Sequence, residues 1–388
     1  MKKIYFDNAC TSFPKPQAVA DSVFEYMTGI GANINRGSYS SAYETENTVY
    51  ETRVKLSALF NAPEPKNVVF TRSITESLNT VIKGYLNPGD HIIVSSMEHN
   101  AIMRPLNELT DKDISFDRIQ ATPLGELKEQ TLEDDIKALI KPNTKAIIMT
   151  HVSNVCGTIM PIRRIGEIAH AHNIKFILDT AGSAGILPID MIEDNIDALC
   201  FTGHKGLLGP QGIGGFILNK SMIDMTRPLI TGGTGSISHT EDIPTFMPDK
   251  FEAGTMNIPG IIGLNSALDF INETKIDKIR QKELKLTDTF LNGLKELEEA
   301  NLIRIIGHKD IINRTGIISI QCKAKDNAEV AHLLDSEYGI MTRVGIHCAP
   351  AAHKTLGTYP TGTIRFSFGY FNTIKEVNYA LTSLKSIL

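Results

Sequence analysis

The chain has 388 residues, of which 42% are hydrophobic and 21% charged, so it is a globular protein long enough for two domains. Its net charge of −5 argues against nucleic acid as a partner, and no apolar run approaches the roughly 18 residues of a membrane span. Asp7 interrupts the amino terminus before a signal peptide could form. Five scattered cysteines without a CxxC pair favour reduced thiols in the cytoplasm over a structural zinc site.

Apolar runs and chain breakers predict alternating strands and helices along most of the chain. Strands are expected near the amino terminus (4–11) and then over 67–70, 91–95, 145–150, 174–178, 198–201, 212–218, 303–306, 317–322 and 363–368, with a further short strand within 114–139. Helices are expected up to residue 27 and over 42–60, 77–86, 162–172, 261–272, 277–300, 327–338 and from 374 onwards, with another before residue 139. Strands that alternate with helices indicate a parallel sheet.

Three polar residues, Asn154, Asp179 and Lys205, each follow one of the successive strands expected between residues 145 and 201. Because parallel strands end at one edge of a sheet, these side chains should lie together. A lysine for a Schiff base, an aspartate for a ring nitrogen and an asparagine for a ring hydroxyl are suited to pyridoxal phosphate. Alone, each has an ordinary explanation as a solvated lysine, a helix cap or a turn residue. The ordered triple favours the cofactor.

Groups suited to a phosphate occur near this edge. Thr202 and His204 flank Lys205 with hydrogen-bond donors. A second anion site is expected where a strand turns into a helix at Thr75 and Glu76, since a helix start offers free N–H groups. Thr75 could equally be an ordinary capping residue.

Two further side chains stand at strand ends or on a strand. His99 follows the strand 91–95 and could stack on an aromatic cofactor or shuttle protons, although a lone histidine is commonly only a surface residue. Arg365 lies on an alternating strand, where a guanidinium could bind a substrate α-carboxylate in a bidentate manner. The alternative for Arg365 is a surface salt bridge.

Cys348 lies in a loop of small residues before Pro350, which should expose its thiol. A protonated His347 beside it would favour the thiolate. A buried, inert cysteine fits poorly in so small and polar a loop. A metal site formed with His347 and His353 would lack a fourth ligand at suitable spacing.

Together, Asn154, Asp179, Thr202-x-His204-Lys205 and Arg343-x-Gly-x-His347-Cys348 resemble the cysteine desulfurases, which belong to the class V aminotransferase-like, fold-type I pyridoxal phosphate enzymes. The resemblance extends from the segment 5–9 to the segment 365–373, and the compact stretch after Cys348 is similar to type II desulfurases and selenocysteine lyases. It implies an α/β fold: a large domain (16–260) with a mostly parallel seven-stranded sheet flanked by helices, and a smaller α+β domain (1–15 and 261–388).

The resemblance also assigns roles to single residues. It implies that Lys205, Cys348 and His99 are catalytic. Cofactor contacts are implied for Thr75, Glu76, His99, Asn154, Asp179, Thr202, His204, Lys205 and, from the other subunit of a homodimer, Thr255. Substrate contacts are implied for Asn8, Arg343 and Arg365. No metal is expected.

Three positions depart from the family pattern. Gly182 stands where the family has a glutamine, Tyr39 replaces a histidine of the RGxH loop, and Asn100 replaces the second histidine of an EHH motif. These departures bear on substrate preference and on the tuning of the cofactor.

The implied reaction removes sulfur from L-cysteine and gives L-alanine and a persulfide on Cys348. A sulfur or selenium acceptor protein would then take the sulfur or selenium from Cys348. Selenocysteine lyase and cysteine sulfinate desulfinase stay open as alternatives, as do a class V aminotransferase, a racemase and a non-catalytic partner in sulfur relay. The sequence does not decide whether Cys10 or Cys156 takes part.

Overall fold

A seven-stranded sheet lies at the centre of the computed structural model, which describes residues 3–35, 37–237 and 239–388. The strand order is β2-β8-β7-β6-β5-β3-β4. The strands are β2 (Val68–Thr71), β3 (His91–Ser95), β4 (Ser115–Ile119), β5 (Thr144–Thr150), β6 (Lys175–Asp179), β7 (Ala198–Thr202) and β8 (Gly214–Leu218). Neighbours from β7 to β4 pair in parallel, and only β8 runs antiparallel to both of its neighbours. The expected mostly parallel seven-stranded sheet is confirmed.

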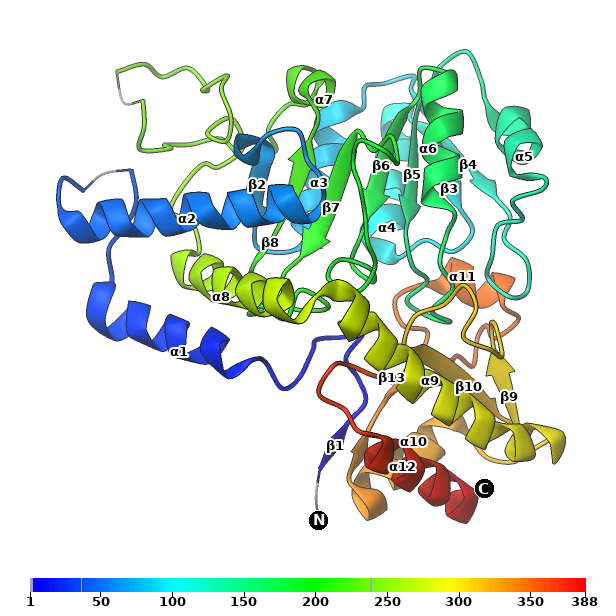
Figure 1. Cartoon of the computed structure of the whole chain (residues 1–388). Helices are drawn as coiled ribbons and strands as arrows, with labels where there is room; N and C mark the ends of the chain where they lie inside the picture. The colour runs from blue at the N-terminus through cyan, green and yellow to red at the C-terminus, as the bar shows by residue number, and fades with distance from the viewer. Residues whose placement is uncertain (1–2, 36, 238) are drawn as a thin grey trace.

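Helices cover both faces of this sheet (Figure 1). One apolar core is formed with α3 (Ile74–Tyr85), α4 (Asn100–Leu109) and α7 (Lys220–Met225). The other core is formed with α1 (Gln17–Glu25), α2 (Ser40–Leu59), α5 (Leu132–Leu139), α6 (Ile162–Ala171) and α8 (Ile258–Thr274). The two helical layers protect the sheet from water on both sides, as a parallel sheet requires.

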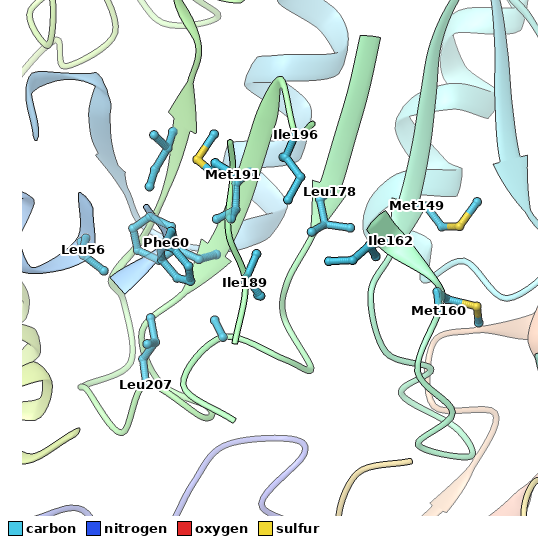
Figure 2. Close-up of a cluster of buried hydrophobic side chains, with 14 of the residues drawn as sticks. Leu56, Phe60, Met149, Met160, Ile162, Leu178, Ile189, Met191, Ile196 and Leu207 are labelled. Atoms are coloured by element: carbon cyan, nitrogen blue, oxygen red, sulfur yellow. The ribbon is translucent and has the colours of Figure 1, made fainter. Parts of the chain in front are cut away.

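The strands are apolar on both faces because each face has its own core. In β5, Ala146 and Ile148 point into one core while Ile147 and Met149 point into the other, as the two-residue period of a strand dictates. Figure 2 shows part of the larger core, where Leu178 of β6 lies among Ile162, Ile189 and Ile196.

A second, antiparallel sheet of four strands has the order β12-β13-β10-β9. Its strands are β9 (Ile303–Ile306), β10 (Ile317–Cys322), β12 (Arg343–Gly345) and β13 (Thr363–Ser367). Helices α9 (Ile276–Glu299), α10 (Asn327–Tyr338) and α12 (Ile374–Ile387) complete its separate core. This is the α+β part that the sequence predicted.

The amino-terminal segment joins the carboxyl-terminal elements (Figure 1). Strand β1 (Ile4–Tyr5) pairs in parallel with β11 (Ile340–Met341), and Asp7 forms a bridge with Ser367 at the end of β13. The exact division into residues 16–260 and 1–15 with 261–388 stays a prediction.

Several helices differ from the sequence interpretation. Helix α3 begins at Ile74, earlier than residue 77, because the Ser73 side chain accepts a hydrogen bond from the Glu76 N–H and caps the helix. Helix α4 was missed, since Pro105 lies inside it, although the buried Ile102, Leu106 and Leu109 have helical spacing. The short helix α11 (Pro350–Thr355) was missed as well.

No helix in the described part of the chain is long and apolar enough to cross a membrane.

We predict that Leu178→Ala lowers the free energy of unfolding by about 2–5 kcal/mol, because it leaves a cavity in a packed core. Leu178 is 0% exposed, whereas Leu124 is 40% exposed, so Leu124→Ala is the matched control and should change stability little. Urea unfolding of both variants checks this. Equal losses in the two variants would contradict the packing argument.

Candidate active site

The carboxyl ends of β5, β6 and β7 lie side by side. In the sheet register, Thr150 pairs with Asp179, and Asp179 pairs with Cys200. Asp179 is the last residue of β6, and the turns after β5 and β7 carry Asn154 and Lys205. The sheet therefore places these three side chains along one edge.

Asp179 and Lys205 form a partly desolvated pair of opposite charge. Burial raises the pKa of the Asp179 carboxyl, while a hydrogen bond from the Ala181 N–H (2.8 Å) and the charge of Lys205 oppose the rise. Burial lowers the pKa of the Lys205 amine, and Asp179 opposes that shift. A lysine with a lowered pKa is more often neutral, which is the nucleophilic form.

The turn that carries Lys205 is fixed through one carbonyl oxygen. The oxygen of His204 accepts hydrogen bonds from Ser12 N–H (3.0 Å) and Oγ (3.2 Å), Thr11 Oγ1 (3.2 Å) and Lys15 Nζ (2.7 Å). Burial lowers the pKa of Lys15 to about 8. The amino-terminal segment thus holds the lysine turn in place.

Two buried polar atoms at this turn have no hydrogen-bond partner among the described residues: Thr202 Oγ1 and His204 Nδ1. Burial and the charges of Lys205 and Lys15 lower the pKa of His204 to about 4, so its ring is neutral at pH 7. Buried polar groups are normally satisfied, so this pair indicates room for a polar ligand.

The start of α3 lies at the end of β2. Thr75 is exposed in the first turn of α3, while Glu76 accepts hydrogen bonds from the backbone N–H (2.8 Å) and Nε (3.1 Å) of Arg72. The carboxylate of Glu76 is thus accounted for by the helix start, and its cofactor contact stays a prediction. Thr255 is exposed and lines a surface cavity with Arg72 and Glu76.

His99 caps the start of α4 with its ring. Its Nδ1 accepts a hydrogen bond from the Ala101 N–H at 3.0 Å, so the proton of the neutral ring lies on Nε2. Burial, then the positive charges of Lys205 and three arginines (Arg343, Arg365 and Arg104), lower the pKa of His99 to about 4. These influences locate the ring close to Lys205.

The loop that presents Cys348 is tied down at its backbone. Cys348 is exposed, its carbonyl accepts a hydrogen bond from the Asn100 N–H (2.9 Å), and the His347 carbonyl accepts one from Asn154 Nδ2 (2.6 Å). The His347 ring lies 2.9 Å from Thr363 Oγ1. The thiol therefore projects from a fixed loop at the same sheet edge.

The expectation that a protonated His347 flanks Cys348 is wrong. Burial, together with nearby Arg365, lowers the pKa of His347 to about 2, so the ring is neutral at physiological pH. The cation beside the thiol is Arg343 instead, whose Nη2 lies 3.7 Å from Cys348 Sγ. The other terminal nitrogen of the same guanidinium, Nη1, lies 3.4 Å from Cys10 Sγ.

Arg343 and Arg365 lie opposite each other on β12 and β13. Arg365 is 1% exposed; its Nη2 forms an ion pair with Asp7 (2.8 Å), and its Nη1 donates to the Asn154 carbonyl (3.0 Å). Its Nε is buried without a partner in the described residues. The side-chain amide of Asn8 donates to the Ser367 carbonyl (3.0 Å) and so ties the amino-terminal segment to the end of β13.

The three departures from the family pattern have distinct surroundings. A Cβ atom at Gly182 would lie 3.1 Å from Val152 Cβ, so a larger side chain there requires Val152 to shift. Gly182 lines a cavity that also reaches Lys205. Tyr39 is exposed at the start of α2, and Asn100 holds the Cys348 carbonyl through its backbone.

Cys156, one of the thiols with an undecided role, is buried in the larger core, where its sulfur lies 3.2 Å from Thr158 Oγ1. Its burial in this core is explained by packing alone. The described residues contain no group of three or more His, Cys, Asp or Glu side chains that could hold a metal ion.

Sequence reasoning missed two positioning residues. Asp7 pairs with Arg365, and Lys15 holds the turn of Lys205. Both partners are far away in the sequence, so no local pattern could have revealed these contacts. The one available signal was the run of polar residues just before Pro14 and Pro16, which does not form a regular element.

The comparisons with known proteins agree with this geometry. A sequence model of the family described as Aminotransferase class-V matches residues 4–380. A probable cysteine desulfurase from Pyrococcus abyssi is 34% identical and one from Methanothermobacter thermautotrophicus 31% identical, each aligned with 99% of this chain and 94% of its own length.

Two solved structures are similar over the whole chain. The apo cysteine desulfurase of Thermococcus onnurineus has a TM-score of 0.90 at 31% identity, with 99% of this chain and 94% of that chain covered. The S-sulfonic acid form of a cysteine desulfurase from Escherichia coli has a TM-score of 0.85 at 28% identity, with the same coverage.

We predict that His347→Gln makes the free energy of unfolding depend less on pH in the acidic range. The buried ring stays neutral in the folded state, whereas the unfolded chain takes up its proton near pH 6.5, so the wild type loses stability as pH falls below 6.5. The variant should reduce this slope by about 1.4 kcal/mol per pH unit. Urea unfolding between pH 7.5 and 5 measures it, with the exposed His332→Gln as control. Identical slopes in wild type and His347→Gln would refute the prediction.

Proposed function

The chain belongs to the class V aminotransferase family, and within that family we propose that it is a pyridoxal phosphate-dependent cysteine desulfurase, which converts L-cysteine to L-alanine. The observation that carries the proposal is the meeting of the Lys205–Asp179 pair with the exposed Cys348 thiol at one sheet edge. The names of the relatives and of the similar structures support it.

The residues present fit pyridoxal phosphate. The unpartnered Thr202 Oγ1 and His204 Nδ1, with the start of α3 at Thr75, supply donors for a phosphate. Lys205 would bind the aldehyde, and Asp179 would hold a proton at the pyridine nitrogen. Asn154 and the neutral ring of His99 would contact the ring of the cofactor. When bound, the cofactor withdraws electrons from the substrate α-carbon, which lowers the barrier to proton removal there.

Lys205 moves the proton in this reaction. Burial favours its neutral form, so that its Nζ can take the α-proton of the substrate and return a proton to carbon. The substrate carboxylate would bind at Arg343 and Arg365, where Asp7 and the Asn154 carbonyl fix the guanidinium of Arg365. The unpartnered Nε of Arg365 and the exposed part of Arg343 leave donors for this contact.

Cys348 takes the sulfur. Its thiolate attacks the substrate sulfur, the bond between that sulfur and the β-carbon breaks, and the carbon skeleton gains a proton to become alanine. The sulfur stays on Cys348 as a persulfide. The nearby Arg343 stabilises negative charge on Cys348 Sγ during the attack.

We also propose a homodimer, a sulfur acceptor protein and a cytoplasmic location. Exposed Phe24, Met27, Tyr43 and Tyr50 lie along α1, the π-helical turn after it and α2, where a second copy would cover them. Thr255 would reach the phosphate of the other subunit. All five cysteines are free, which suits a reducing compartment.

We predict that Lys205→Ala abolishes covalent attachment of pyridoxal phosphate. Wild-type protein should turn yellow with the cofactor and keep it after borohydride reduction, with the mass addition on the peptide of Lys205. The variant should lose both signals. Lys250→Ala is the matched control, because burial also lowers the pKa of Lys250, but its Nζ donates to the Ile223 carbonyl away from the site. A mass addition on another lysine of the wild type would contradict the assignment.

We predict that Cys348→Ala lowers alanine formation from L-cysteine by at least about 100-fold, because it removes the nucleophile, while the absorbance of the bound cofactor is unchanged. Cys322→Ala, a half-buried thiol on β10, should keep full activity. Alanine release from cysteine, selenocysteine and cysteine sulfinate is measured side by side. Wild-type activity in Cys348→Ala on cysteine would refute the mechanism, and a preference of the wild type for selenocysteine or the sulfinate would select one of those activities instead.

A further inference from the structure

Two thiols share one guanidinium at the proposed active site. Arg343 Nη1 lies 3.4 Å from Cys10 Sγ, and its Nη2 lies 3.7 Å from Cys348 Sγ. Both nitrogens are bonded to the same carbon atom of a planar group, so the two sulfurs flank a single rigid cation. Their peptides come from opposite ends of the chain.

Cys10 also belongs electrostatically to the Lys205 site. Its charge is among the influences on the pKa values of Lys205 and Arg365, after burial and the nearer charges have acted. The segment of Cys10 is fixed on both sides: the Asp7 carboxylate pairs with Arg365, and Thr11 and Ser12 hold the His204 carbonyl. The half-buried thiol is therefore held at the site.

We propose that Cys10 is a second sulfur-carrying residue, which accepts the outer sulfur of the Cys348 persulfide; this rests on the desulfurase function proposed above. The Cys10 thiolate attacks the outer sulfur, a new S–S bond forms, and the old one breaks with Cys348 leaving as a thiolate. The negative charge moves from Cys10 to Cys348, the outer sulfur keeps its proton, and no oxidant or reductant is consumed. Sulfane sulfur is thereby shared between the exposed and the half-buried thiol.

The guanidinium of Arg343 favours this transfer between the two thiols. Negative charge moves from one sulfur to the other, and Arg343 donates a hydrogen bond to each, so the same cation stabilises the charge before and after transfer. Cys348 is exposed, so the persulfide formed on it is accessible to a second thiol. The half-buried position then shields the sulfur from thiols in solution.

The other cysteines provide internal comparisons. Cys156 and Cys200 are buried in the two cores of the large sheet. Cys322 is half-buried like Cys10, but it lies at the end of β10, and burial raises its pKa to about 11. It should carry no sulfur.

The test locates the sulfur by mass. Holoenzyme is treated with one equivalent of L-cysteine, alkylated with iodoacetamide, digested without reductant, and each cysteine peptide is weighed. In wild type, the adduct with one extra sulfur should occur on both Cys10 and Cys348, and not on Cys322. In Cys348→Ser it should disappear from Cys10, and in Cys10→Ser it should be confined to Cys348.

Several results would overturn the relay. These are an adduct on Cys348 alone in the wild type, an adduct on Cys10 that persists in Cys348→Ser, or a peptide with Cys10 and Cys348 crosslinked in place of the Cys10 adduct. The wild-type measurement needs no variant to fold.

A second loading separates this proposal from the desulfurase function. If L-cysteine loads no cysteine, the desulfurase function fails, and inorganic polysulfide is used to load the protein instead. The relay then holds if the Cys10 adduct falls at least about fivefold in Cys348→Ser, and it is refuted if wild type and variant carry equal amounts. Circular dichroism of Cys348→Ser confirms that the comparison is made on folded protein.

Discussion

The Lys205 amine and the Asp179 carboxylate are buried together at the end of the central sheet. The rest of the site depends on how these two opposite charges balance each other. Burial moves the pKa of Lys205 down and that of Asp179 up, and each opposes the shift of the other. Burying these two charged groups is unfavourable, and the apolar cores on both faces of β6 and β7 offset that free energy. The site therefore needs the complete sheet.

Backbone hydrogen bonds bring the other segments to this pair. The His204 carbonyl binds the amino-terminal segment, Asn154 binds the loop of Cys348, and the first N–H of α4 binds Cys348 itself. These contacts join the seven-stranded sheet to the elements around β12 and β13. The Cys348 thiol and the Lys205 amine thus come from segments far apart in the sequence but hold fixed positions relative to one another.

Charge at the thiols comes from an arginine rather than from a histidine. His347 is adjacent to Cys348 in sequence, yet its ring is turned into the protein, and burial keeps it neutral. Arg343 reaches both Cys348 and Cys10 because β12 begins directly after β11, which pairs with the amino-terminal strand β1. Because one cation lies between the two sulfurs, it can stabilise negative charge on either of them during a sulfur exchange.

The sequence by itself determined the central sheet and the edge at which Asn154, Asp179 and Lys205 follow their strands, because apolar runs and their periods are local properties. It also determined the resemblance to the desulfurases. Only the tertiary structure decided which groups carry charge at that edge: burial neutralised His347, and residues 333 positions apart brought Arg343 to Cys10. Desolvation and contacts between distant residues depend on the packed fold, and no local pattern encodes them.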